Sequence, residues 1–233
     1  MTLPTVAFRQ PILCYVTDRT ALHGGSQSFL DRVRDKVRIA TAAGVDWIQI
    51  REKDLPTREL LTLTGDAFRI AHAASDGPRV IVNDRLDIAL AAGADGVHLG
   101  GESIAFADLI RWCQRGNAPP GFLIGVSCHE LEEAREAERA GASYVFFGPV
   151  YDTPSKRSFG SPQGITRLTR VSEALRIPAI AIGGVTEKNA AETLRAGAAG
   201  IAAIRLFQES GDAESSRSVV ECLHQSLARD AQL

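Results

Sequence analysis

The chain has 233 residues and a formal net charge of -2, which suits one barrel-sized domain and gives no reason to expect nucleic acid or an acidic membrane surface as a partner. No run of about 18 apolar residues and no charged-then-apolar leader occurs, so we expect a soluble protein of the cytoplasm, with no membrane partner. Four cysteines without a CxxC pair argue against structural zinc and against a disulfide framework.

Short apolar runs alternate with longer amphipathic stretches along the chain, a pattern typical of parallel β/α units. The predicted strands, in chain order, are 12–16, 45–50, 80–82, 96–99, 123–126, 144–147, 179–182 and 200–204. The predicted helices are 28–43, 57–74, 84–92, 105–115, 130–140, 163–175, 187–196 and 213–227. Residues 1–11 are predicted to be a tail or a cover over the barrel floor.

A repeated phrase marks the passage from helix to strand: Ala-Gly, two mostly small or acidic residues, then an apolar run. Its four copies begin at Ala43, Ala92, Ala140 and Ala196. Glycine ends a helix in the left-handed conformation without a Cβ clash, and the spacing leaves room for a further strand and helix between copies. We therefore expect one α/β domain over 1–233, a (β/α)8 TIM barrel, with its active site on the loops after the strands.

The residues that follow the predicted strands have the chemistry of anion binding. Arg51 and Lys53 follow the second strand, with Gln49 on the same side, and together they offer donors suited to phosphate or pyrophosphate. Gly183 and Gly184 follow the seventh strand just before a helix, where free N–H groups form a candidate phosphate site.

Asp84 follows the third strand and is a candidate ligand for Mg²⁺, which proteins hold through one or two carboxylates plus substrate phosphates. The segment 148–162 is long for a barrel loop, which is typical of a binding loop or lid. Two anion sites and a metal carboxylate indicate a reaction of two phosphorylated substrates, one of which loses pyrophosphate. Plainer alternatives stay open: Asp84 as a helix cap, or Arg51 and Lys53 in surface ion pairs with neighbouring acids.

Eight short segments in order carry a family resemblance. They are Tyr15–Asp18, Gln49–Lys53, Val82–Arg85, Gly93–Gly100, Gly125–Ser127, Phe147–Val150, Thr153–Lys156 and Ala181–Gly184. Together they resemble thiamine phosphate synthase. The resemblance implies a Mg²⁺-dependent transferase that joins hydroxymethylpyrimidine pyrophosphate to a thiazole phosphate and releases pyrophosphate. The implied mechanism is dissociative: pyrophosphate leaves the pyrimidine methylene carbon, and the thiazole nitrogen captures the resulting cation.

The resemblance also implies roles for individual residues. Those implied to bind the pyrophosphate-bearing substrate are Gln49, Arg51, Lys53 and Asn83. Those implied to bind the thiazole phosphate are Thr153, Ser155 and Gly184. Those expected to stabilise the leaving group or contact the reacting centre are Arg51, Lys53, Ser127 and Lys156. Asp84 is implied to hold Mg²⁺.

Two positions depart from the family pattern. Ser103 stands where the family places a second metal-binding Asp, with Glu102 beside it as a candidate substitute. Arg205 replaces a serine expected near the phosphate after the eighth strand, where it would strengthen or block that site. Because of these departures, two alternative functions stay open. One is a metal-free thiazole tautomerase that would use His129, and the other is a non-catalytic binder of thiazole or thiamine phosphate. Small phosphorylated molecules are the expected ligands, and a homodimer is one candidate state.

Overall fold

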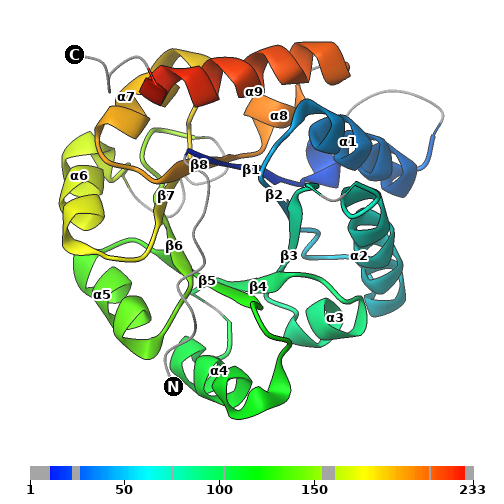
Figure 1. The fold of residues 1–233 in the computed structure, drawn as a ribbon, viewed down its shortest axis with the longest axis horizontal. Helices are drawn as coiled ribbons and strands as arrows, with labels where there is room; N and C mark the ends of the chain where they lie inside the picture. Colours follow the sequence, from blue (N-terminus) through cyan, green and yellow to red (C-terminus); the bar gives the residue numbers. More distant parts are fainter. Residues whose placement is uncertain are drawn as a thin grey trace.

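Eight parallel strands close into a barrel in the order β1 to β8, with helices around the outside (Figure 1). The computed structural model describes residues 11–22, 27–74, 76–101, 103–153, 161–209 and 211–228. The strands are β1 Ile12–Val16, β2 Trp47–Ile50, β3 Arg79–Asn83, β4 Gly96–Leu99, β5 Leu123–Cys128, β6 Tyr144–Phe147, β7 Ala179–Ile182 and β8 Gly200–Ala203. The predicted (β/α)8 barrel is confirmed.

The helices follow the strands as predicted, with a few differences at their ends. They are α1 Phe29–Ala43, α2 Thr57–Ala71, α3 Leu86–Ala91, α4 Phe106–Trp112, α5 Leu131–Ala140, α6 Gly164–Ala174, α7 Glu187–Arg195, α8 Arg205–Gln208 and α9 Ala213–Ala228. A short 3-10 helix, η1 (Arg19–Ala21), follows β1, and a π-helical turn, η2 (Cys113–Asn117), follows α4. α8 is absent from the predicted elements, because four residues are too few to show a helical period.

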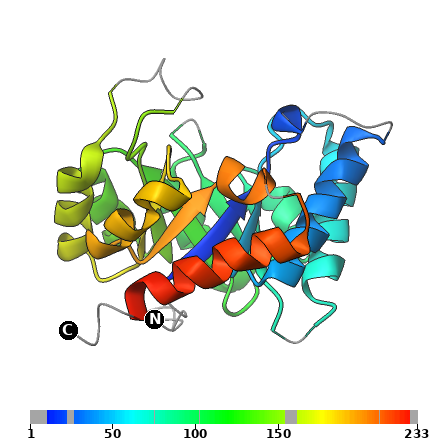
Figure 2. The same ribbon diagram turned by 90° about the horizontal axis from the view of Figure 1, so that it is seen from above.

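The glycines of the four repeated phrases adopt the predicted conformation, with φ between 72° and 99°. Gly44 and Gly141 are the C-cap residues of α1 and α5. Viewed from the side, η1 and the described start of the loop after β6 lie at the same edge of the barrel (Figure 2). The strands are parallel, so this edge is where their C-terminal ends meet.

Alternation along the strands divides the core into two layers. One layer fills the barrel, and its largest side chains are Trp47, Tyr144 and Phe146. The rings of Trp47 and Tyr144 are 4.6 Å apart between centroids, and those of Tyr144 and Phe146 are 5.3 Å apart. The other layer joins the outer face of the barrel to the helices. Bulk from β2 and β6 thus closes the barrel below the level of the strand ends.

No helix in the described part of the chain is long and apolar enough to cross a membrane. The predicted tail, 1–11, lies outside the described residues except for its last position.

Candidate active site

A cavity of about 640 Å³ opens at the C-terminal ends of the strands, and every strand or the loop after it contributes to its lining. The predicted site residues that line it are Gln49, Arg51, Lys53, Asn83, Ser127, His129, Thr153, Gly183, Gly184 and Arg205. Three further predicted residues, Glu102, Ser155 and Lys156, lie outside the described residues. The structure therefore brings together most of the candidates that can be placed.

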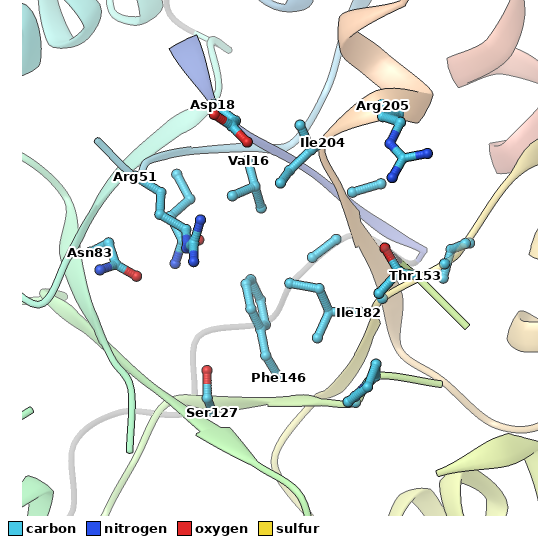
Figure 3. A pocket seen from close by; sticks show the side chains of 18 of the residues that line it. Val16, Asp18, Arg51, Asn83, Ser127, Phe146, Thr153, Ile182, Ile204 and Arg205 are labelled. Atoms are coloured by element: carbon cyan, nitrogen blue, oxygen red, sulfur yellow. The ribbon is translucent and has the colours of Figure 1, made fainter. Parts of the chain in front are cut away.

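The cavity has two polar sides separated by an apolar floor. Arg51 and Asn83 lie on one side, and Thr153 and Arg205 lie on the opposite side (Figure 3). The apolar floor consists of Val16, Phe146, Ile182 and Ala202. A ligand with two charged groups joined by flat rings matches this arrangement.

Gln49 is held inside the barrel, where it is 1% exposed. Its Nε2 donor has no hydrogen-bond partner among the residues that the structure describes, although the side chain lines the cavity. A buried donor without a partner costs about 1–3 kcal/mol. A ligand with an acceptor at this depth would recover that cost.

Arg51 and Lys53 form no ion pair with any described residue, so the predicted alternative of surface pairs with neighbouring acids is wrong. Instead, Arg19 forms ion pairs with both Glu52 and Asp54: its Nη1 lies 3.3 Å from Glu52 Oε2 and 2.5 Å from Asp54 Oδ1. Burial raises the pKa of Glu52, and hydrogen bonds from nearby donors oppose that rise. The two acids are thus satisfied by Arg19, and the charges of Arg51 and Lys53 remain available to an anion in the cavity.

Asp84 is a non-glycine residue in the left-handed region, at φ 61°, directly after β3. It does not cap α3, whose N-cap position is Arg85, so the capping alternative is wrong. Asp84 Oδ1 accepts hydrogen bonds from Ser103 Oγ and from the Gly100 N–H, the latter at 3.2 Å. Asn83 Nδ2 donates to Oδ2 at 2.6 Å. Asp84 and Ser103 do not line the cavity, whereas Asn83 does. A non-glycine residue held in the left-handed region is typical of functional positions.

Ser127 is the cavity-facing end of a buried polar contact. It lies within β5, where His98 Nε2 is 2.9 Å from its Oγ. His98 is 2% exposed, and burial lowers its pKa to about 3, so the ring is neutral at physiological pH. His98 is therefore both a core residue and part of the cavity lining.

Gly183 and Gly184 adopt φ values of 95° and 70°, and the N–H groups of both donate to no other described residue. A Cβ on Gly184 would lie 2.7 Å from the Asp152 carbonyl oxygen, so glycine is needed where the β6 loop crosses. Thr186 then caps α7 through a reciprocal pair of bonds with Asn189. Amides without an acceptor among the described residues, beside a helix N-terminus, are a geometry that phosphate sites use.

His129 and Arg205 lie at the rim. His129 Nδ1 is bonded to the Gly148 carbonyl oxygen, which fixes the ring beside the cavity. Arg205 is exposed and opens α8, whose Gln208 donates from Nε2 to the Asp18 carbonyl oxygen at 2.8 Å. This bond ties α8 to the loop after β1.

The apolar floor is missing from the sequence predictions. Alternation along β6, which places Phe146 on the same inward face as Tyr144, is the signal that identifies such residues.

Comparisons with known proteins give one consistent result. The sequence model of a family described as thiamine monophosphate synthase matches residues 13–207. A thiamine-phosphate synthase of Methanoculleus marisnigri is 41% identical over 201 residues, covering 86% of this chain and 89% of the relative. One of Roseiflexus castenholzii is 40% identical over 205 residues, covering 88% and 84%. The solved thiamine phosphate pyrophosphorylase of Pyrococcus furiosus superposes with a TM-score of 0.78 at 31% identity, covering 93% of this chain and 97% of that one.

Proposed function

The chain belongs to the thiamine monophosphate synthase family, and we propose that it joins hydroxymethylpyrimidine pyrophosphate to a thiazole phosphate, forming thiamine phosphate and pyrophosphate. It is a transferase of that family. The observation that carries the proposal is the cavity with two polar sides and an apolar floor. Each polar side would take one phosphorylated group, and the two rings would meet over the floor.

The side formed by Arg51, Lys53 and Asn83 is proposed to bind pyrophosphate. Arg51 offers a planar fork and Lys53 a mobile point charge, and neither is neutralised by a described acid. Gln49 Nε2 lies buried nearby on β2, where a ring nitrogen of the pyrimidine would satisfy it. Lys156, outside the described residues, is proposed on the resemblance to contact the same group.

The opposite side is proposed to bind the thiazole phosphate. Gly183 and Gly184 present N–H groups that have no acceptor among the described residues, Thr153 lines the same side, and Arg205 adds a cation. Arg205 is thus expected to strengthen the phosphate site. Ser155 is assigned here by the resemblance.

In the reaction, the bond between the methylene carbon and the pyrophosphate oxygen breaks, and the electron pair leaves with pyrophosphate. The lone pair of the thiazole nitrogen then forms the new carbon–nitrogen bond. Charge therefore accumulates on the leaving group, where Arg51 and Lys53 are aimed. Each preorganised contact of this kind contributes about 3 kcal/mol to the transition state. The apolar floor keeps water from the carbon as charge develops on it.

The oxygen donors at the end of β3 suit Mg²⁺. Asp84 Oδ2 accepts one described hydrogen bond and keeps a further lone pair, and the Ser103 hydroxyl lies in contact with Oδ1. One carboxylate plus substrate phosphates is an ordinary Mg²⁺ site. We propose that Asp84 holds Mg²⁺, with Ser103 as a supporting oxygen and Glu102 as the further candidate; the bound ion would neutralise pyrophosphate charge.

The experiment that tests this function mixes the purified chain with both phosphorylated substrates and measures pyrophosphate, with and without Mg²⁺. We expect release that requires both substrates and the metal. No release above background would overturn the proposal. The tautomerase alternative would instead show metal-independent conversion of a thiazole carboxylate phosphate that is lost in His129→Asn. Binding of thiazole phosphate without turnover would indicate the non-catalytic binder.

We also propose that 1–233 form one domain with 1–11 as a tail or floor cover. A cytoplasmic location and a homodimer remain predictions from the sequence.

A further inference from the structure

A line of three polar side chains runs from the barrel interior to the cavity. Tyr144 OH on β6 lies 3.2 Å from His98 Nδ1 on β4, and His98 Nε2 lies 2.9 Å from Ser127 Oγ on β5. Tyr144 is 0% exposed and His98 is 2% exposed, while half-buried Ser127 lines the cavity. Of the three, only Ser127 has an expected role, since the family resemblance implies that it stabilises the leaving group or contacts the reacting centre.

The contact between Tyr144 and His98 crosses β5, which lies between their strands. In register, His98 pairs with Gly125 and Gly125 pairs with Tyr144. A Cβ on Gly125 would come within 2.1 Å of Tyr144 Cζ and 2.5 Å of His98 Nδ1. Glycine at this position is therefore what gives the two side chains room to meet.

The number of protons on Tyr144 and His98 decides which atom is the donor in each of these two hydrogen bonds. Tyr144 OH has one proton and, among the described residues, one hydrogen-bond partner, His98 Nδ1. If Nδ1 carried the ring proton instead, the Tyr144 proton would be buried without an acceptor, at a cost of about 1–3 kcal/mol. Tyr144 therefore donates to Nδ1. The ring is 2% exposed and its two nitrogens contact only hydroxyl groups among the described residues, so it is neutral and its single proton sits on Nε2.

We propose that His98 is a positioning residue, held by Tyr144 as the Nε2–H tautomer, which donates to Ser127 Oγ and so directs the Ser127 proton into the cavity. Ser127 then presents a donor to an anionic oxygen. In the opposite tautomer, Nε2 would accept the Ser127 proton, and the hydroxyl would turn lone pairs toward the anion. The inference rests on the proposed function in one respect, namely that the anion is pyrophosphate.

The tautomer is tested directly by nitrogen NMR of the full chain labelled with ¹⁵N-histidine. We expect a pyridine-type shift at Nδ1 and a pyrrole-type shift at Nε2 of His98, assigned by loss of the signals in His98→Gln. If His98→Gln does not fold, Ser127→Ala identifies the ring through a shift at Nε2. The reversed pattern, or a protonated ring at pH 7, would overturn the inference. This result does not depend on activity, so it is separate from any failure of the proposed function.

The positioning role is tested by kinetics on six proteins: wild type, His98→Gln, His98→Leu, Ser127→Ala and the two double variants that combine Ser127→Ala with each change at His98. Loss of one hydrogen bond predicts a fall in kcat of up to about tenfold for Ser127→Ala. His98→Gln keeps an amide donor and should retain more activity than His98→Leu, whose kcat should match that of Ser127→Ala. In the Ser127→Ala background, neither change at His98 should reduce kcat further. Multiplying losses would overturn the role. If His98→Leu does not fold, Tyr144→Phe replaces it in the same cycle.

Discussion

The two polar sides of the cavity are built by different means. Arg51 and Asn83 reach it as side chains at the ends of β2 and β3, which the barrel holds rigidly. Opposite them, Gly183 and Gly184 offer backbone N–H groups whose positions depend on how two loops cross. We therefore expect that function on the first side can be removed one side chain at a time with little loss of stability. On the second side, we expect binding and stability to change together.

The largest expected effect is on the side-chain side. Arg51→Gln should lower kcat/KM about 100- to 1,000-fold, as loss of one preorganised donor to a developing anion does. Thermal stability should hold, because the Arg51 N–H keeps its 3.0 Å bond to Thr17 Oγ1. Steady-state kinetics and a thermal melt measure both. Arg58→Gln, at an exposed position of α2, is the matched control and should change neither. A stability loss in Arg51→Gln as large as its activity loss would contradict the comparison.

Asp84→Asn should weaken Mg²⁺ about 10- to 100-fold, with activity partly restored by excess metal. The measurement is pyrophosphate release against Mg²⁺ concentration. The control is Asp95→Asn: Asp95 Oδ2 accepts from the Val80 N–H at 2.7 Å, so its loss should lower the melting temperature and leave the Mg²⁺ response unchanged. Equal effects on activity would make Asp84 structural.

Gly184→Ala tests the backbone side. A Cβ at φ 70° and 2.7 Å from the Asp152 carbonyl oxygen should cost about 1–3 kcal/mol of stability. It should also raise KM for the thiazole phosphate more than KM for the pyrimidine substrate. Gly65→Ala in α2 is the opposite case: its Cβ meets nothing within 4 Å, and the helix should gain about 0.5–1 kcal/mol. An unchanged KM ratio in Gly184→Ala would remove the glycine pair from the phosphate site.

Burial of His98 predicts that the protein loses stability at acidic pH. The pKa of His98 falls from 6.5 in the unfolded chain to about 3 in the folded one, chiefly through burial; Asp84 opposes the shift and Arg51 adds to it. Below pH 6.5 the unfolded state takes up a proton that the folded state refuses. The free energy of unfolding should therefore fall by up to about 1.4 kcal/mol per pH unit between pH 6.5 and 3. Urea melts across this range should lose that slope in His98→Gln; an unchanged slope would contradict it.

The smallest expected effect is that of Ser103→Asp. A second carboxylate beside Asp84 should destabilise the metal-free protein through repulsion and recover that loss when Mg²⁺ is added. Activity at saturating metal should stay the same or rise slightly. Thermal melts with and without Mg²⁺ measure how much stability the metal restores. A sharp fall in the activity of Ser103→Asp would show that Ser103 has a role other than supporting the metal.

Much of the fold can be predicted from the sequence, because the Ala-Gly phrases mark helix ends and the apolar runs mark strands. Both signals are local, so they can be recognised without knowledge of the tertiary structure. The candidate site is readable where polar residues follow strands, as Arg51, Asn83 and Gly184 do. Contacts between residues far apart in the sequence could not be predicted in this way. No signal in the sequence around Glu52 predicts its ion pair with Arg19. The contact between Tyr144 and His98 forms only because β5 places a glycine between them.

The apolar floor carries no charge, and neither phosphate-binding side includes its residues. Among the floor residues Phe146 is the largest side chain and Ala202 the smallest, so these two positions leave the most room for a change of volume. Exchanging volume between them would retune which heterocycles fit while both anion anchors stay untouched. We therefore expect the choice of heterocycle and the affinity for phosphate to be separately adjustable in this barrel.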